Sequence, residues 1–344
     1  QPKPGSVLTP CLPPHRFSVS LARMKFKAVM ENDGMVAGGC GAQSMVLHVL
    51  QALQRLERAL DKKQAQRNAT PPSVVLKLTP ESFALAHRGG ADEGSCTWSH
   101  FVTGQLFSEY RIESKRDNQI DLEAPLANLL HVFSSCSSSD RTTIRLANGS
   151  DGRPILGFEF ALPGNVADHR VEQDVPVRVI PEEEAATIRE PALPEPEYQI
   201  ELPQSLGKIK NVLERMKAVG AQHILMEVAQ ERTATPGSVA GTAGSSAPSG
   251  RAWMKFVAEA ELVTISSTFP SLRLVMEGKD SRPPVGPVRL FLSLRRLTEV
   301  FSAIQGITAE SHIACILQNR ALVVYALLPK NLGSLISYTP AVTV

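Results

Sequence analysis

Lysine and arginine side chains recur on the polar faces of three predicted helices. These helices are expected over 43–60, 204–219 and 295–305, where apolar residues repeat three or four positions apart on the opposite face. Long cationic side chains suit a phosphate backbone, which they attract without reading a base sequence. A merely solvated helix face would show the same pattern, so both interpretations stay open. The cations concerned are Arg55, Arg58, Lys208, Lys210, Arg215, Arg295 and Arg296.

A fourth predicted helix, over 126–136, has no lysine or arginine and offers Asn128, His131 and Ser135 instead. Acidic residues also stand among the cations of the other three helices, at Glu57, Glu214 and Glu299. Any contact with phosphates is therefore expected to be weak and sliding rather than fixed.

A glycine-rich turn precedes the first of these helices, with Gly39, Cys40 and Gly41 leading into it. It resembles the start of a dinucleotide-binding loop, but Ser44 stands where the third glycine belongs. The later strands do not alternate with helices as a doubly wound fold requires, and no Gly-Lys-Ser/Thr forms a phosphate loop. Nucleotide binding is therefore a weak interpretation.

Groups that could act as catalysts or metal ligands are scattered. His48 and His131 are expected on helix surfaces, and the clusters 182–184 and 195–197 are glutamate-rich runs in a proline-punctuated segment. A metal-dependent nuclease needs carboxylates fixed on rigid elements, so these runs are poor candidates. The five cysteines form no CxxC pair, which argues against zinc and favours reduced thiols. We expect no enzyme activity, cofactor or metal.

Length and composition indicate a soluble globular chain of two domains. Its 344 residues can bury a large core, and a net charge of +2 is too small to draw nucleic acid to the whole molecule. The predicted organisation is a disordered extension over 1–23, domains over 24–181 and 198–344, and a connector over 182–197. A Gly/Ser/Ala/Pro-rich insertion, expected to be flexible, covers 231–250 of the second domain.

The two domains repeat one order of elements. Each begins with a strand and a helix, continues with several strands, and ends with a second helix and more strands. The clearest pair is 118–133 and 288–304, where an alternating strand runs directly into an amphipathic helix. Strands in runs with only two helices per half indicate an α+β fold, with helices on one face of antiparallel sheets.

Several segments resemble the sliding-clamp family. They read MKFKAVM from Met24, DVPVRVIP from Asp174, LPQSLGKIKNVLERMK from Leu202 and VRLFLSLRRLTEVFSAIQG from Val288. The later two are similar to proliferating cell nuclear antigen. The first two, and the insertions, look most like the Hus-one family of subunits in the nine-one-one DNA-damage checkpoint clamp.

The resemblance implies a DNA-clamp fold whose helices line a hole for double-stranded DNA, with the seven cations named above facing it. It implies a heterotrimer with Rad-nine and Rad-one subunits, a separate clamp loader, a nuclear location and contacts with repair and signalling proteins. A groove for partner peptides would lie beside the connector, lined by Ile188, Ala192 and Leu193.

Two other functions stay open on the sequence. A homotrimeric replication clamp would share the fold and the cations. A metal-dependent DNA-processing nuclease belongs to a different class and would need a carboxylate site that the sequence does not indicate.

Overall fold

The computed structural model describes residues 24–32, 41–64, 72–88, 95–161, 170–232, 248–275 and 286–342. The extension predicted for 1–23 lies outside these ranges, as do Gly39 and Cys40 of the glycine-rich turn. Residues 233–247 of the predicted insertion also lie outside. The flanks of that insertion, 231–232 and 248–250, belong to the strands on either side.

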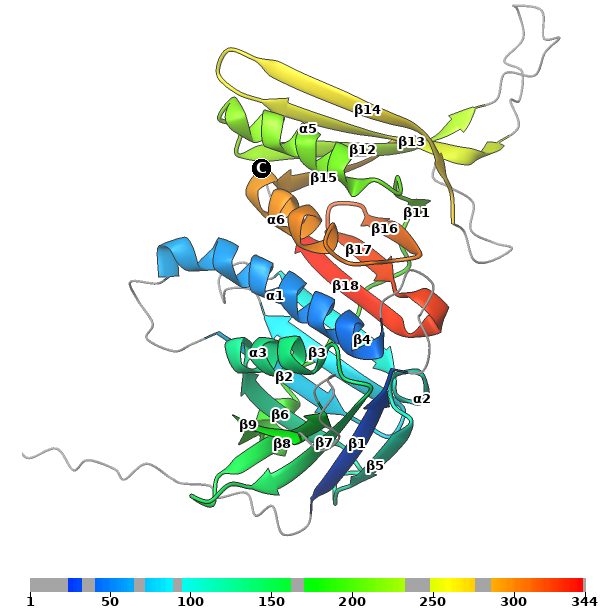
Figure 1. Ribbon diagram of the computed structural model, residues 1–344. Helices are drawn as coiled ribbons and strands as arrows, with labels where there is room; N and C mark the ends of the chain where they lie inside the picture. Colours follow the sequence, from blue (N-terminus) through cyan, green and yellow to red (C-terminus); the bar gives the residue numbers. More distant parts are fainter. Residues whose placement is uncertain are drawn as a thin grey trace, which may run out of the picture.

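The first half of the chain folds in the predicted order, with small shifts at the ends of elements (Figure 1). Its elements are β1 (Lys25–Glu31), α1 (Ala42–Gln64), β2 (Ser73–Leu78), β3 (Ser82–Arg88), β4 (Cys96–Val102), α2 (Thr103–Leu106), β5 (Glu109–Glu113), β6 (Ile120–Pro125), α3 (Leu126–Cys136), β7 (Arg141–Asn148), β8 (Pro154–Ala161), β9 (Arg170–Pro176), β10 (Arg178–Val179) and α4 (Glu182–Ala185).

The second half repeats this plan with one strand fewer before its second long helix. Its elements are β11 (Tyr198–Glu201), α5 (Leu206–Ala218), β12 (His223–Arg232), β13 (Pro248–Glu259), β14 (Thr264–Arg273), β15 (Val288–Ser293), α6 (Leu294–Ile304), β16 (Ser311–Leu317), β17 (Ala321–Leu327), a 3-10 helix (Pro329–Asn331) and β18 (Gly333–Pro340).

Alternating apolar residues in the sequence predict continuous strands over 106–113 and 175–180, and the structure divides both. The run expected over 106–113 forms α2 and then β5, because Leu106 and Phe107 turn inward and are buried in the core. The run over 175–180 is split at Pro176, which has no N–H to donate to a ladder. There the chain leaves the sheet of β8 and β9 and pairs Arg178 with Glu123 in another sheet.

Each half consists of two similar units, and each unit is a strand, a long helix and the strands that follow. Within a half, the two units exchange their first strands. Strand β1 joins β7, β8 and β9, whereas β6, which precedes α3, joins β2, β3 and β4. In the second half β11 pairs with β16, and β15 pairs with β12. In each half, the first strand of one unit lies in the sheet of the other unit. Because neither unit has a complete sheet without the other, the chain repeats whole domains rather than small stacked modules.

One strand pair joins the two halves. Strands β4 and β18 run antiparallel with Gly333 opposite Phe101 and Tyr338 opposite Cys96, which makes a continuous sheet of nine strands. The four long helices lie together on one side of the sheets (Figure 1). Their apolar faces supply much of the main core, for example Val49 and Leu53 of α1 and Leu297 and Phe301 of α6. No helix in the described part of the chain is long and apolar enough to cross a membrane.

A buried histidine in this core makes stability depend on pH. His312 on β16 is 8% exposed, and burial lowers its pKa below the usual 6.5. The unfolded chain then binds more protons than the folded chain below about pH 6.5, so stability present at neutral pH is lost on acidification. We expect wild type to lose more free energy of unfolding than His312→Leu between pH 7.5 and 5.5, measured by urea unfolding.

The matched control for this prediction is His131→Leu, which removes a histidine exposed on α3. It should keep the wild-type pH profile. Equal pH profiles for wild type and His312→Leu would contradict the prediction.

Candidate nucleic-acid interface

The helices form a row in the order α3, α1, α6, α5. Helix α1 packs against α3 on one side and α6 on the other, and α6 packs against α5. The row crosses the joint between the two halves without a break (Figure 1). It therefore presents a single helical surface opposite the sheets, on which the predicted cations can be placed one by one.

Helix α5 carries the most exposed of these cations. Lys208 and Arg215 are exposed seven residues apart, which places them on one stripe of the helix two turns from each other. Lys210 is half-buried, with its Nζ 3.7 Å from Glu214 one turn on. Lys217 is exposed in the last turn and was missed by the sequence prediction; it lies seven residues after Lys210, on a different side of the helix from Lys208 and Arg215.

Arg55 of α1 lies against the end of α6. A side chain at Gly306 would overlap the guanidinium of Arg55, so the glycine leaves the space that this cation fills. The side chain of the neighbouring Gln305 reaches Gly207 at the start of α5, one residue before Lys208. The fold thus brings Arg55 and Lys208, from opposite halves of the chain, to the same part of the helical row.

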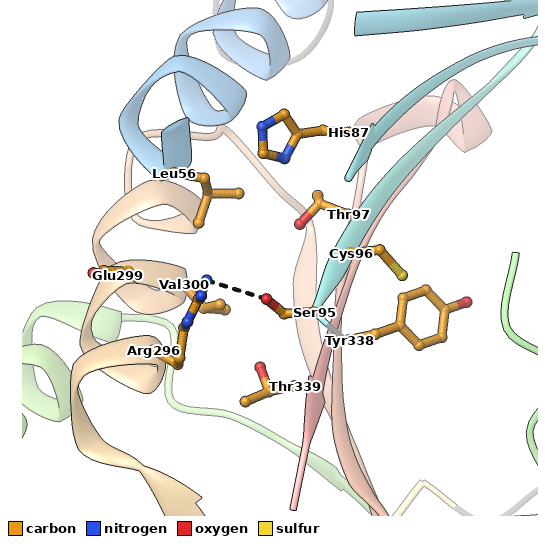
Figure 2. A pocket seen from close by; sticks show the side chains of 10 residues that line it. All are labelled: Leu56, His87, Ser95, Cys96, Thr97, Arg296, Glu299, Val300, Tyr338 and Thr339. Carbon is orange, nitrogen blue, oxygen red and sulfur yellow. Dashed lines mark hydrogen bonds between the residues drawn. The ribbon is translucent and has the colours of Figure 1, made fainter. Parts of the chain in front are cut away.

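The two arginines of α6 are engaged in different contacts. Arg295 Nε donates to Glu299 at 2.8 Å, one turn along the helix. Arg296 Nη1 donates to Ser95 Oγ at 3.2 Å, and burial lowers the pKa of this guanidinium. Figure 2 shows Arg296 pointing from α6 toward the strands at the joint, beside Thr339. Arg296 is half-buried and bridges the two halves, so its guanidinium is less open to solvent than the sequence suggests.

The side chain of Arg58 lies outside the described residues, so its predicted place is neither supported nor corrected. Helix α3 presents Asn128 and His131 to solvent. Glu57, expected to weaken the contact with phosphates, turns inward, where its Oε2 lies 2.5 Å from Nε2 of the buried His87. The acidic contribution to the helical surface is therefore smaller than the sequence suggests.

The predicted peptide groove is partly filled by the chain itself. Ile188 is buried in a cluster on the outer face of the nine-stranded sheet with Trp98 and Tyr338, whereas Ala192 and Leu193 are exposed. Glu190 accepts hydrogen bonds from Tyr338 and from His100, and His100 is the main cause of its lowered pKa. The connector is therefore anchored to the sheet by single residues of its first part, whereas residues 191–195 are all exposed.

The metal-dependent nuclease considered for the sequence would need several metal ligands close together. Within the residues that the structure describes, no three His, Cys, Asp or Glu side chains gather as metal ligands would. Glu182 and Glu183 are exposed, while Glu184 receives the guanidinium of Arg178. Of these carboxylates, Glu184 anchors the connector to β10 through Arg178.

Comparison with known proteins gives one family. The family model described as Hus1-like protein matches residues 24–343. Checkpoint protein hus1 of Schizosaccharomyces pombe is 28% identical over 179 residues, which cover 51% of this chain and 58% of that protein. Checkpoint protein HUS1 of Homo sapiens is 29% identical over 160 residues, covering 45% and 55%. The chain spans about half the length of the curated relatives that it matches.

Among solved structures, the chain is similar to the proliferating cellular nuclear antigen of Entamoeba histolytica. The TM-score is 0.60 with 11% identity, over 92% of this chain and 99% of that one. At this identity the likeness concerns the fold alone, and it confirms the predicted α+β clamp architecture.

Proposed function

Because this chain belongs to the Hus1-like family, we propose that it is a non-catalytic subunit of a heterotrimeric checkpoint clamp. Such a clamp encircles double-stranded DNA at damage or stalled forks and holds signalling and repair proteins there. The observation that carries the proposal is the single row of helices, with exposed cations on α1 and α5, on the side opposite the sheets. Cations on rigid helices attract phosphates without reading bases, as a sliding subunit requires.

The strand pair that joins the two halves of the chain is a precedent for how neighbouring subunits would pair. Strands β4 and β18 are each the last strand of their unit, and they pair edge to edge. The last strands of the other two units are β14 and β9, and both lie at a sheet edge within the described structure. Unpaired edges normally need pairing or cover, so we infer that β9 and β14 meet the neighbouring subunits.

The two edges differ in charge, which favours unlike neighbours. Strand β9 carries Arg170, Glu172 and Asp174, whereas β14 is uncharged from Thr264 to Leu272. In a homotrimer β9 of one copy would pair with β14 of the next, whose one cation, Arg273, is already paired with Glu201 of its own chain. The partners proposed are Rad-nine and Rad-one subunits, with a separate clamp loader and a nuclear location.

This proposal predicts the behaviour of the isolated chain. Expressed alone, it should be monomeric or poorly soluble near ten micromolar or so, where specific interfaces of standard size are usually occupied. Co-expressed with its clamp partners, it should give a stable complex with one copy of each subunit. Light scattering with mass measurement distinguishes these states.

A well-behaved trimer of three identical chains would contradict the heterotrimer and favour a replication clamp instead. The matched control is a chain with charges added to the β14 edge, Ser266→Lys with Thr268→Lys. It should fold alone but fail to enter the complex, because added charge blocks edge pairing.

A further inference from the structure

An apolar depression lies at one end of the second half of the chain. Its volume is about 880 Å³, and it lies between the end of α5, the turn joining β13 to β14, and the outer face of β12 and β15. In the described residues six large apolar side chains are exposed, and four of them line this depression. Leu262 is 95% exposed and Phe291 is 40% exposed. Gatherings of this kind mark binding surfaces more often than isolated exposed residues do. The four are Val219, Leu262, Val263 and Phe291.

The repeat inside the chain supplies an equivalent surface for comparison. In the first half Ser73 pairs with Pro125, directly before α3, and in the second half His223 pairs with Ser293, directly before α6. This register aligns β2 with β12 and β6 with β15, residue by residue. The outward row Glu123, Val75, Ala86 and Trp98 therefore corresponds to the row Phe291, Leu225, Val257 and Ser266.

In the first half the connector covers this row. Ile180, Ala185 and Ile188 pack in one cluster with Ala86 and Trp98. Ala185 and Ile188 are three residues apart on the turn that contains α4, so a single short helical turn presents both. Lys77 Nζ fixes this segment by donating to the carbonyl of Ile188 at 2.8 Å.

In the second half Val342 donates its N–H to the carbonyl of Phe291 at 2.8 Å, as Arg178 pairs with Glu123 in the first half, and no other described segment takes the place of the connector. Phe291 and Leu225 keep part of their apolar surface in water, although the corresponding row of the first half is covered. Phe291 stands at the position equivalent to Glu123, which forms a salt bridge with Arg178 in the first half. A segment bound here would therefore gain apolar contact at the position where the connector has a salt bridge.

The depression is bordered by acidic residues at the turn that joins β13 to β14. Glu259 and Glu261 are exposed beside Leu262 and line the same depression. Glu227, which corresponds to Lys77, accepts from Arg289 Nε at 2.9 Å and so leaves little net charge on the other side. The ligand that fits is apolar on one face and carries lysine or arginine toward Glu259 and Glu261.

We propose that this depression binds a segment of a partner protein that forms one helical turn, with two apolar side chains and adjacent basic residues. It would cover the β12–β13–β15 surface as the connector covers the first half. This binding surface is separate from the helical row and from the β9 edge, and it adjoins β14 through Ser266 and the turn that joins β13 to β14. Binding by an apolar face of a short helix in a groove is a common mode of peptide recognition.

The test uses the full chain and two fluorescein-labelled peptides. One has the connector sequence of residues 180–190, and the other has the same sequence with E182K, E183K and E184K. The lysine peptide should bind at least tenfold more tightly than the acidic one, measured by fluorescence anisotropy. Phe291→Ser and Leu262→Ser should each weaken its binding about tenfold, since each removes apolar area at the contact.

Two further variants make the test specific. Glu259→Lys with Glu261→Lys should reverse the preference between the peptides, and Val102→Ser, an exposed apolar residue of the first half, should change nothing. Equal binding of both peptides, or unchanged binding to Phe291→Ser, would overturn the proposal. A dimer of the chain that dissociates on Leu262→Ser would also overturn it, because the patch would then be a contact between copies.

Discussion

Replacing Gly333 with alanine should destabilise the chain by about 3 kcal/mol or more. Gly333 begins β18 with φ +150°, a conformation that side chains rarely adopt. A β-carbon there would also overlap the backbone carbonyl of His100 on β4, and backbone cannot move aside as a flexible side chain can. Because this glycine lies opposite Phe101 in the strand pair that joins the halves, the damage should fall on the joint.

Urea unfolding followed by circular dichroism measures this effect. If the joint loosens before the halves unfold, the transition of the variant should broaden or divide, with a lower m-value. Gly104→Ala is the matched control, because a β-carbon at Gly104 meets nothing within 4 Å. It should be neutral or slightly stabilising in the short helix α2. A Gly333→Ala protein as stable as Gly104→Ala would refute the role given to this glycine.

Elements with strong periodicity could be predicted from the sequence. Helix α3 begins and ends at the predicted residues, Leu126 and Cys136, because its apolar positions repeat without interruption. The run over 175–180 was predicted as one strand, and only the change of sheet at Pro176 divides it. Periodicity identifies a strand, but it does not say which partner will accept its hydrogen bonds.

The direction of side chains at the joint could not be predicted in the same way. Arg295 and Arg296 follow each other on α6 and read alike in the sequence. Arg296 turns toward Ser95, which lies 201 residues earlier in the chain, whereas Arg295 stays with Glu299 on its own helix. Local spacing contains no information about a contact of that separation, so a helical pattern alone overstates the open cationic surface.

The connector contains an apolar residue whose burial could not be predicted from the local sequence either. Its acidic, proline-rich composition predicts an exposed segment, and this is correct for Ala192 and Leu193. Ile188 is buried, because it packs on an apolar surface formed by Trp98 and Tyr338. These two residues are far apart in the sequence but lie on neighbouring strands. A single isoleucine in a polar run gives no sign of that surface.

Neutralising the exposed cations of the helical row should weaken DNA binding on the order of 100-fold near 0.15 M salt. The variant is Arg55→Ala with Lys208→Ala and Arg215→Ala, tested in the assembled clamp. Each lost phosphate contact should lower the slope of log affinity against log salt by about 0.9. The loss should be equal for duplexes of different sequence, because phosphate contacts carry no base information.

Two comparisons decide whether position or total charge is responsible. Lys25→Ala with Arg153→Ala removes exposed cations from strand β1 of the five-stranded sheet and from the turn between β7 and β8, and should leave the salt slope unchanged. Arg296→Ala should have a smaller effect on the slope than Lys208→Ala, since its guanidinium is held at the joint by Ser95. If the triple variant keeps the wild-type slope, or if the sheet variant loses as much, the helical cations are merely solvated. DNA would then have to contact another surface of the clamp.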